Sequence, residues 1–220
     1  MAETLRTFIA VELNDEIKKT ITQVEDDLKT TGCDVKWVKP ENAHLTLKFL
    51  GHIKEKRLGP LVEVLDSLFI ELPLNKHNFK SPTSVKELQG RFEVGKGKLN
   101  KDIHPIQTGL TQVGAFPSPE RPRVIWIGLR DDERPISRLA ESVEEALGNI
   151  GFKKEKKRFQ PHITIGRVRS THNLSSLTKK FAQYSLSAAP DLIISSITLF
   201  KSTLTSSGPI YEPLKKFLLS

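Results

Sequence analysis

Residues 44–51 read HLTLKFLG, and a second stretch with the same pattern, HITIGR, lies at residues 162–167. Both begin His-x-Thr-x with an aliphatic residue at each x. Such alternation of polar and apolar residues is typical of a β-strand with one buried face. Side chains two residues apart in a strand point to the same face, so each histidine shares a face with its threonine. The sequence therefore predicts two strands that each present an imidazole beside a hydroxyl.

The same order of elements surrounds both motifs. An apolar strand at residues 5–13 and an amphipathic helix that ends near residue 30 precede the first motif. A second apolar strand at residues 124–129 and a helix at residues 134–149 precede the second. A helix and one or more strands follow each motif. The pattern predicts two lobes related by a pseudo-twofold axis, with His44 and His162 facing each other across a cleft.

One segment interrupts this repeat. Residues 73–104 contain three glycines, two prolines and many basic residues, with no clear hydrophobic period. We expect a loop or hairpin insertion there. The whole chain, residues 1–220, reads as one bilobal domain that contains this insertion.

Composition limits the class of protein. The 220 residues carry 34 Lys and Arg against 26 Asp and Glu, a formal net charge of +8. Such a balance favours polyanionic partners through electrostatic steering. No apolar run is long enough for a membrane span, so we expect no membrane partner. A single cysteine, Cys33, and the lack of a signal-like N-terminus indicate a reducing, cytoplasmic location.

The paired motifs suit acid–base chemistry. Unperturbed histidine has a pKa near 6.5, so one imidazole can accept a proton while another donates one. The hydroxyls of Thr46 and Thr164 can stabilise a phosphoryl oxygen. The set therefore suits a phosphodiester, in particular a strained cyclic phosphate, with His44 and His162 as the catalytic pair. We expect no cofactor and no metal, because neither motif contains the further ligands that a zinc site requires.

Two cations and three aromatic residues near the motifs are further candidates for substrate binding. Alternation places Lys48 on the histidine face, where it could approach a phosphate. The same rule places Arg167 on the opposite face, unless the strand bulges near Gly166 or ends there. The aromatic residues could stack on a base, although the sequence favours core positions for all three: Phe49, Trp126 and Tyr211.

These motifs resemble the signatures of the 2H phosphoesterase superfamily. The chain is most similar to its RNA 2′,3′-cyclic phosphodiesterase branch, also called 2′-5′ RNA ligases. Further matching stretches are RTFIAVEL (6–13), FPSPERPRVIWIGL (116–129), GFKKE (151–155) and KSTLTSSGPIYEPL (201–214). The resemblance implies an α+β, bilobal fold, with two antiparallel-rich sheets lining a central cleft.

The resemblance also implies an activity. It is the metal-independent hydrolysis of RNA 2′,3′-cyclic phosphate ends to 2′-phosphomonoesters, together with reversible 2′-5′ ligation of tRNA halves. His44 and His162 would then be catalytic, and Thr46 and Thr164 would hold the phosphate. We expect a monomer that binds RNA. Two alternatives stay open: a phosphodiesterase for a small cyclic nucleotide such as ADP-ribose 1″,2″-cyclic phosphate, and a catalytically silent RNA-binding module.

Overall fold

The computed structural model describes residues 4–71, 98–99 and 103–219 of the chain. Four α-helices lie in this part: α1 (Asp15–Lys29), α2 (Leu58–Phe69), α4 (Pro135–Asn149) and α5 (Leu174–Phe181). The strands before the gap are β1 (Thr4–Glu12), β2 (Val35–Trp37), β3 (His44–Lys54) and β4 (Ile70–Glu71). The strands after it are β5 (Lys98–Leu99), β6 (Ile106–Thr108), β7 (Leu110–Phe116), β8 (Val124–Leu129), β9 (His162–Val168), β10 (Leu192–Ile194), β11 (Ser196–Thr205) and β12 (Gly208–Leu218).

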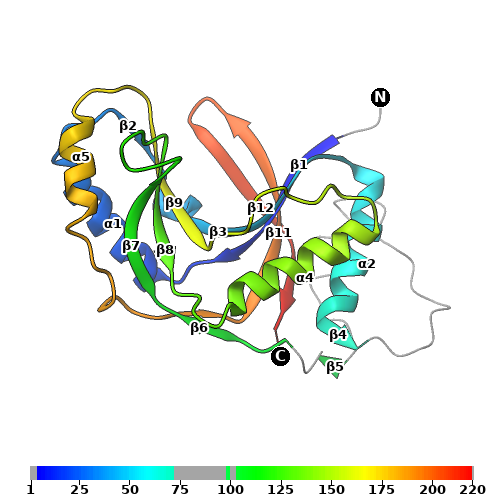
Figure 1. The fold of residues 1–220 in the computed structure, drawn as a ribbon. Coiled ribbons are helices and arrows are strands. Elements are labelled where there is room, and N and C mark those ends of the chain that lie inside the picture. Colours follow the sequence, from blue (N-terminus) through cyan, green and yellow to red (C-terminus); the bar gives the residue numbers. More distant parts are fainter. Residues whose placement is uncertain (1–3, 72–97, 100–102, 220) are drawn as a thin grey trace.

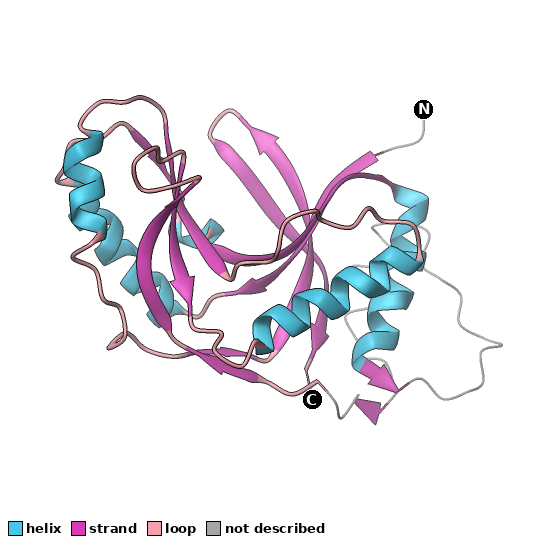
Figure 2. Cartoon of the chain, in the orientation of Figure 1, coloured by secondary structure: helices cyan, strands magenta, loops and turns pink. Residues whose placement is uncertain are grey.

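Eight strands form one curved antiparallel sheet, shown in Figure 2. Its main order is β12-β11-β1-β3-β9-β8-β7, so the two motif strands are neighbours at its centre. They join through a single residue pair, Leu45 with Ile163. Beyond that pair β3 and β9 diverge, and β2 pairs with β9 from Val168 to Gly166. The sheet is thus two half-sheets that meet at the motifs.

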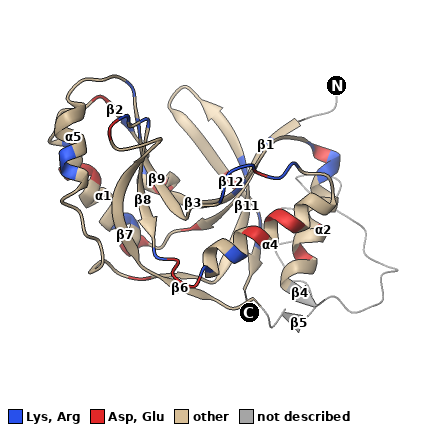
Figure 3. Cartoon of the chain, viewed as in Figure 1, with Lys and Arg blue, Asp and Glu red and all other residues tan. Residues whose placement is uncertain are grey.

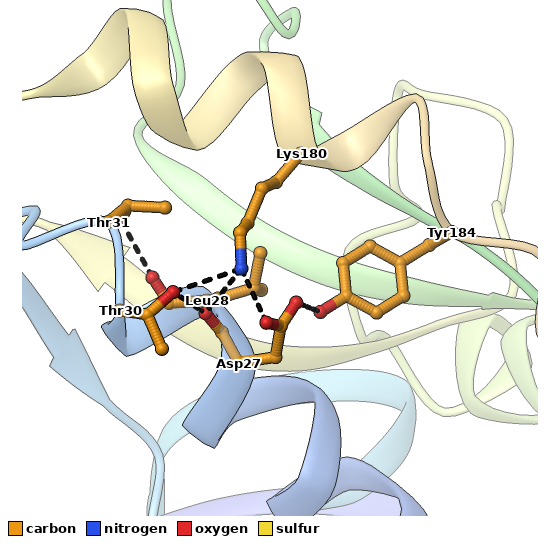
Figure 4. Close-up of polar contacts among 6 residues, drawn as sticks. All are labelled: Asp27, Leu28, Thr30, Thr31, Lys180 and Tyr184. Carbon is orange, nitrogen blue, oxygen red and sulfur yellow. Dashed lines mark hydrogen bonds and ion pairs between the residues drawn. The ribbon is translucent and has the colours of Figure 1, made fainter.

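Each lobe takes elements from both halves of the sequence. Helices α2 and α4 pack against each other beside β12 and β3, whereas α1 lies with α5 on the other side of the molecule (Figure 1). One polar cluster ties α1 to α5 (Figure 4): Asp27 accepts hydrogen bonds from Lys180 and Tyr184. The Lys180 ammonium also donates to the Thr30 hydroxyl at 3.0 Å. The predicted two-lobed α+β fold is confirmed, and the exchange of helices between the sequence halves adds to it.

Local sequence explains where the first helix, α1, begins and ends. The Asn14 side chain accepts a hydrogen bond from the Ile17 amide at 2.9 Å and so caps α1. Residues at helical spacing, including Ile17, Ile21 and Leu28, are fully buried. The chain leaves the helix through Gly32, whose φ of +68° favours glycine.

One hydrophobic core runs through both lobes. A second, much smaller cluster lies on the opposite face of the sheet, where Phe8, Ala10 and Phe200 pack with Tyr211. The predicted insertion at residues 73–104 falls mostly outside the described residues. Close to its ends, β4 pairs with β5 in a short two-stranded sheet.

Candidate active site

The four motif residues lie on one face of the sheet centre. Strand pairing between β3 and β9 is antiparallel and consists of Leu45 with Ile163, so His44 and Thr164 flank this pair at one end and Thr46 and His162 flank it at the other. Each histidine therefore faces the threonine of the other motif. The arrangement interleaves two imidazoles and two hydroxyls.

Both histidines are held in the same orientation. The Nδ1 atom of His44 lies 2.7 Å from the Asn42 carbonyl oxygen, and that of His162 lies 2.7 Å from the Gln160 carbonyl oxygen. A carbonyl can only accept, so Nδ1 carries the hydrogen in each ring. The other nitrogen, Nε2, is then free of a proton in the neutral ring. Each imidazole can accept a proton there or, once charged, donate one.

Burial shifts the pKa values of both histidines in the same direction. Loss of solvation lowers the pKa of His44 and of His162 below the ordinary value of 6.5. The carbonyl contacts oppose this effect and raise both pKa values. The positive charge of His162 lowers the pKa of His44 further. The two imidazoles repel each other when both are charged, so the pair favours holding a single proton.

Aromatic rings surround His44. Its ring centroid lies 4.9 Å from that of Phe8 and 5.3 Å from that of Tyr211, which meets it edge-on. Burial raises the pKa of Tyr211, and the charges of Arg6 and Arg167 oppose that rise. The phenol is therefore a neutral hydrogen-bond donor beside the imidazole at neutral pH.

Two aromatic rings also lie beside His162. Its ring lies 5.0 Å from Phe116 and 6.5 Å from Trp126, both in edge-on geometry. The Trp126 indole covers Gly114 on the next strand so closely that a Cβ there would lie 2.4 Å from the ring. Glycine at that position is what lets the indole lie against the sheet. Phe116, Trp126 and His162 line a cavity of about 320 Å³.

Both motif strands bulge at the third residue after the histidine. In the pairing of β3 with β1, Leu47 is an extra residue between two matched pairs. In the pairing of β9 with β8, Ile165 is extra in the same way. A bulge reverses which face later side chains point to. Sequence alternation therefore predicts the wrong face after Ile165 in β9 and, in β3, between Leu47 and a second bulge at Leu50.

Lys48 shows the effect of the first bulge. Alternation placed it on the histidine face, and this placement is wrong: its side chain is only 3% exposed and lies on the helix-covered face. There its ammonium contacts Glu144 of α4 at 2.7 Å. The next residue, Phe49, turns to the histidine face instead and is 57% exposed. Its predicted core position is also wrong.

Arg167 shows the effect of the second bulge. The side chain is exposed and acts electrostatically on Tyr211, whose ring touches His44. It pairs across the strands with Val124, on the face that Trp126 and Thr164 share. The bulge that the sequence left open thus exists, one residue before Gly166. Tyr211 and Trp126 are half-buried against the histidines rather than in the core.

The sequence did not single out three residues of this face. Arg6 reaches Ser202 at 3.3 Å and acts on Tyr211, while Phe8 and Phe116 each pack on a catalytic candidate. All three lie in stretches that resemble the family, but their roles depend on strand register. That register has no signal in a single sequence.

Two features are absent from the part of the chain that the structure describes. No group of three or more His, Cys, Asp or Glu side chains lies together there as a metal site would need. None of the helices in this part of the chain is both long and apolar enough to cross a bilayer.

Comparison with known proteins identifies the family. The model of the LigT-like phosphoesterases matches residues 11–87 and 127–211. An RNA 2′,3′-cyclic phosphodiesterase of Methanocaldococcus jannaschii is 32% identical over 97% of this chain and 100% of that protein. A protein of the same name from Archaeoglobus fulgidus is 31% identical over 97% and 99% of the two chains.

Solved structures agree on the fold. A Thermus thermophilus protein superposes with a TM-score of 0.70 at 21% identity, covering 98% of each chain. Escherichia coli LigT, solved in complex with 3′-AMP, gives 0.68 at 20% identity and covers 99% of each chain. Fold and site together define a two-histidine phosphoesterase scaffold. The chain belongs to the LigT-like phosphoesterase family and is an enzyme, so the alternative of a catalytically silent binding module is not supported.

Proposed function

We propose that this enzyme hydrolyses the 2′,3′-cyclic phosphate at RNA ends to a 2′-phosphomonoester by general acid–base catalysis with two histidines. The observation that carries the proposal is the interleaving of His44, Thr164, Thr46 and His162 on one sheet face. The relatives at about one-third identity are named for this activity, which supports RNA as the substrate.

The reaction needs one proton acceptor and one proton donor. His44 removes a proton from water through Nε2, and the resulting oxygen attacks phosphorus. The bond from phosphorus to the 3′ oxygen breaks, and His162 gives its Nε2 proton to that oxygen. The products are a 2′-phosphomonoester and a 3′ hydroxyl, and the proton gained by His44 returns to solvent.

The remaining groups stabilise negative charge. The Thr46 and Thr164 hydroxyls donate to the phosphoryl oxygens, whose charge grows as water attacks. Arg167 adds a fixed positive charge on the same face. The anionic substrate itself raises the pKa of the nearby imidazoles, so binding favours the protonated form of His162.

We propose that this chemistry proceeds without a metal and that a 5′ hydroxyl in place of water joins two ends through a 2′-5′ linkage. His44 takes the proton of that hydroxyl, its oxygen attacks phosphorus, and His162 protonates the 3′ oxygen as its bond to phosphorus breaks. When the linkage is cleaved back to the cyclic phosphate and the 5′ hydroxyl, the two histidines exchange roles, as microscopic reversibility requires. Halves of tRNA are then one substrate class, in keeping with the family resemblance. A small cyclic nucleotide remains the competing substrate.

The decisive experiment is hydrolysis of an RNA oligonucleotide that ends in a 2′,3′-cyclic phosphate, with EDTA present. We expect full activity and a 2′-phosphate product. Loss of activity on chelation would contradict the metal-free mechanism, and a 3′-phosphate product would contradict the leaving group. A higher kcat/KM for ADP-ribose 1″,2″-cyclic phosphate than for the oligonucleotide would favour the small-nucleotide alternative.

A further inference from the structure

A basic loop follows α4 and leads to the second motif. Residues 152–158 read FKKEKKR, five basic residues against one acidic. Residues 153–158 are all exposed, whereas Phe152 is buried. Figure 3 shows this loop as a basic stretch that passes over the sheet between α4 and β9. It is a strong local concentration of positive charge in a chain of net charge +8.

The loop lies along an edge of β3 that no described strand occupies. In the first half of the chain, β2 lies between α1 and its motif strand and pairs with β9. The loop has the corresponding place in the second half, between α4 and β9, but forms no strand. A cavity of about 430 Å³ remains between it and the β3 edge, lined by residues 48–50 and 152–157.

A buried ion pair fixes the loop backbone. The Lys48 ammonium donates to the Lys153 carbonyl oxygen at 2.7 Å and to Glu144 Oε1 at 2.9 Å. The same carboxylate oxygen of Glu144 accepts a hydrogen bond from the Glu155 amide. One lysine and one glutamate thus hold a carbonyl and an amide of the loop. We call Lys48 and Glu144 the clamp. Because the Lys48 charge is neutralised by Glu144 inside the protein, it is not available to bind substrate.

The loop connects with the catalytic face at both ends. At one end, Phe49 lines the cavity and its ring lies 6.2 Å from Phe8, which contacts His44. At the other end, Arg158 lines the cavity beside His162. The basic loop therefore extends from the cavity beside Phe49 to the cavity beside His162.

We propose that this loop, residues 153–158, binds RNA phosphates outside the reacting group, and that Lys48 and Glu144 are positioning residues that hold it. The inference rests on the proposed function. A 2′,3′-cyclic phosphate is the 3′ end of a strand, so every further phosphate lies on its 5′ side. The loop accordingly binds the 5′ continuation of the substrate, and the exposed Phe49 ring offers a stacking surface beside it. Longer RNA is thereby preferred over a mononucleotide.

A charge-matched comparison tests the loop. Lys156→Gln/Lys157→Gln removes two exposed loop charges, and Lys19→Gln/Lys179→Gln removes two exposed charges from α1 and α5. Fluorescence anisotropy measures the Kd of an RNA decamer that ends in 2′-phosphate at several salt concentrations. We expect the loop variant to weaken binding at least fivefold and to reduce the slope of log Kd against log salt by about 1.4, roughly 0.7 per lysine. An equal change in the α1 and α5 variant, or none in the loop variant, would overturn the proposal.

A second pair of variants tests the clamp. Lys48→Met leaves Glu144 without its partner and could unfold the region. Lys48→Met/Glu144→Met removes both charges and keeps two unbranched side chains, so a thermal melt close to that of the wild type is expected. In this double variant we expect faster tryptic cleavage within residues 153–158 and a higher KM for the decamer that ends in a cyclic phosphate, with kcat unchanged. Unaltered cleavage and KM would refute the positioning role.

Hydrolysis of cytidine 2′,3′-cyclic monophosphate separates this inference from the proposed function. This substrate has no 5′ phosphates, so the loop and clamp variants should hydrolyse it at the wild-type kcat/KM. A wild-type enzyme inactive on both substrates would contradict the proposed function. If the wild type is active and the loop variant loses the same factor in kcat/KM on both substrates, the loop site is contradicted and the proposed function is not.

Discussion

His44 and Thr164 flank the same end of the residue pair that joins the two motif strands, Leu45 with Ile163, so each histidine lies on the side of the other motif's threonine. A single pair between the central strands sets this register, and the four groups share one sheet face. Neither motif is a complete site alone. Its partner threonine and its partner imidazole both come from the other half of the chain.

Loss of either imidazole should remove one limb of the profile of kcat/KM against pH. We expect His44→Ala and His162→Ala each to lower kcat by roughly 10²–10⁴-fold, the usual contribution of a general acid or base. In His44→Ala the acidic limb of kcat/KM should disappear, and in His162→Ala the basic limb. Initial rates on the cyclic-phosphate oligonucleotide measure this. If His44→Ala instead loses the basic limb and His162→Ala the acidic limb, then His162 is the base and His44 the acid. Near-normal rates in either variant would contradict catalysis by the two histidines.

The wild-type pH optimum should lie below 6.5. The base works above its pKa and the acid works below its own, and burial lowers both pKa values. Both limbs of kcat/KM therefore fall on the acidic side of the free histidine value. Above the upper limb the rate should fall about tenfold per pH unit. An optimum above pH 7 with the mononucleotide substrate would contradict the direction of these shifts.

The threonine hydroxyls should contribute through hydrogen bonds rather than packing. Thr46→Val and Thr164→Val keep the shape and remove the donor. We expect kcat/KM to fall by about 10²–10³-fold in each, as for the loss of an oxyanion donor. Thr46→Ser and Thr164→Ser retain the hydroxyl and should stay within severalfold of the wild type. Equal losses in the valine and serine variants would indicate a packing role instead.

The position of the Trp126 ring beside His162 depends on Gly114. A Cβ at this position would lie 2.4 Å from the Trp126 ring, so Gly114→Ala must displace the indole. We expect a changed emission of Trp126 in a Trp37→Phe background, and a raised KM. In Gly114→Ala/Trp126→Ala the clash is absent, so the glycine substitution should add little to the loss caused by Trp126→Ala alone. Additive effects of the two substitutions would contradict the coupling.

Glu25 should make stability depend on pH in an unusual direction. Burial of this α1 residue raises its pKa to about 7 from 4.5. The folded state then holds a proton that the unfolded state has lost, so stability falls as pH rises from about 4.5 to 7. Glu25→Gln should be more stable than wild type at pH 8 by up to about 3 kcal/mol, and similar at pH 4. Urea unfolding measures this, with the exposed Glu145→Gln as control; a gain that does not change with pH would contradict it.

The sequence predicted the parts of the site that depend on local alternation. His44 and Thr46 share a face as expected, as do His162 and Thr164, because each pair precedes its bulge. Beyond the bulges the period of two fails. Lys48 is buried against Glu144, and Phe49 takes the place on the cleft side that alternation gave to Lys48.

The exchange of helices between lobes could not be predicted either. Helical periodicity locates α1 and α4 in the sequence, but it does not say which half-sheet each one covers. That choice follows from packing between distant residues, such as the contact of Asp27 with Lys180 across 153 positions. A single sequence records such contacts only as separate polar residues.

Phe49 and Arg167 occupy equivalent positions, each five residues after its histidine, and this difference breaks the symmetry of the scaffold. A nucleic-acid strand has a direction. A site with true twofold symmetry would accept it in two opposite orientations of equal free energy, and only one of them would present the 3′ oxygen to the acid. An aromatic ring on one side and a guanidinium on the other remove that degeneracy. The duplicated fold thereby acquires a polarity that its repeated motifs lack.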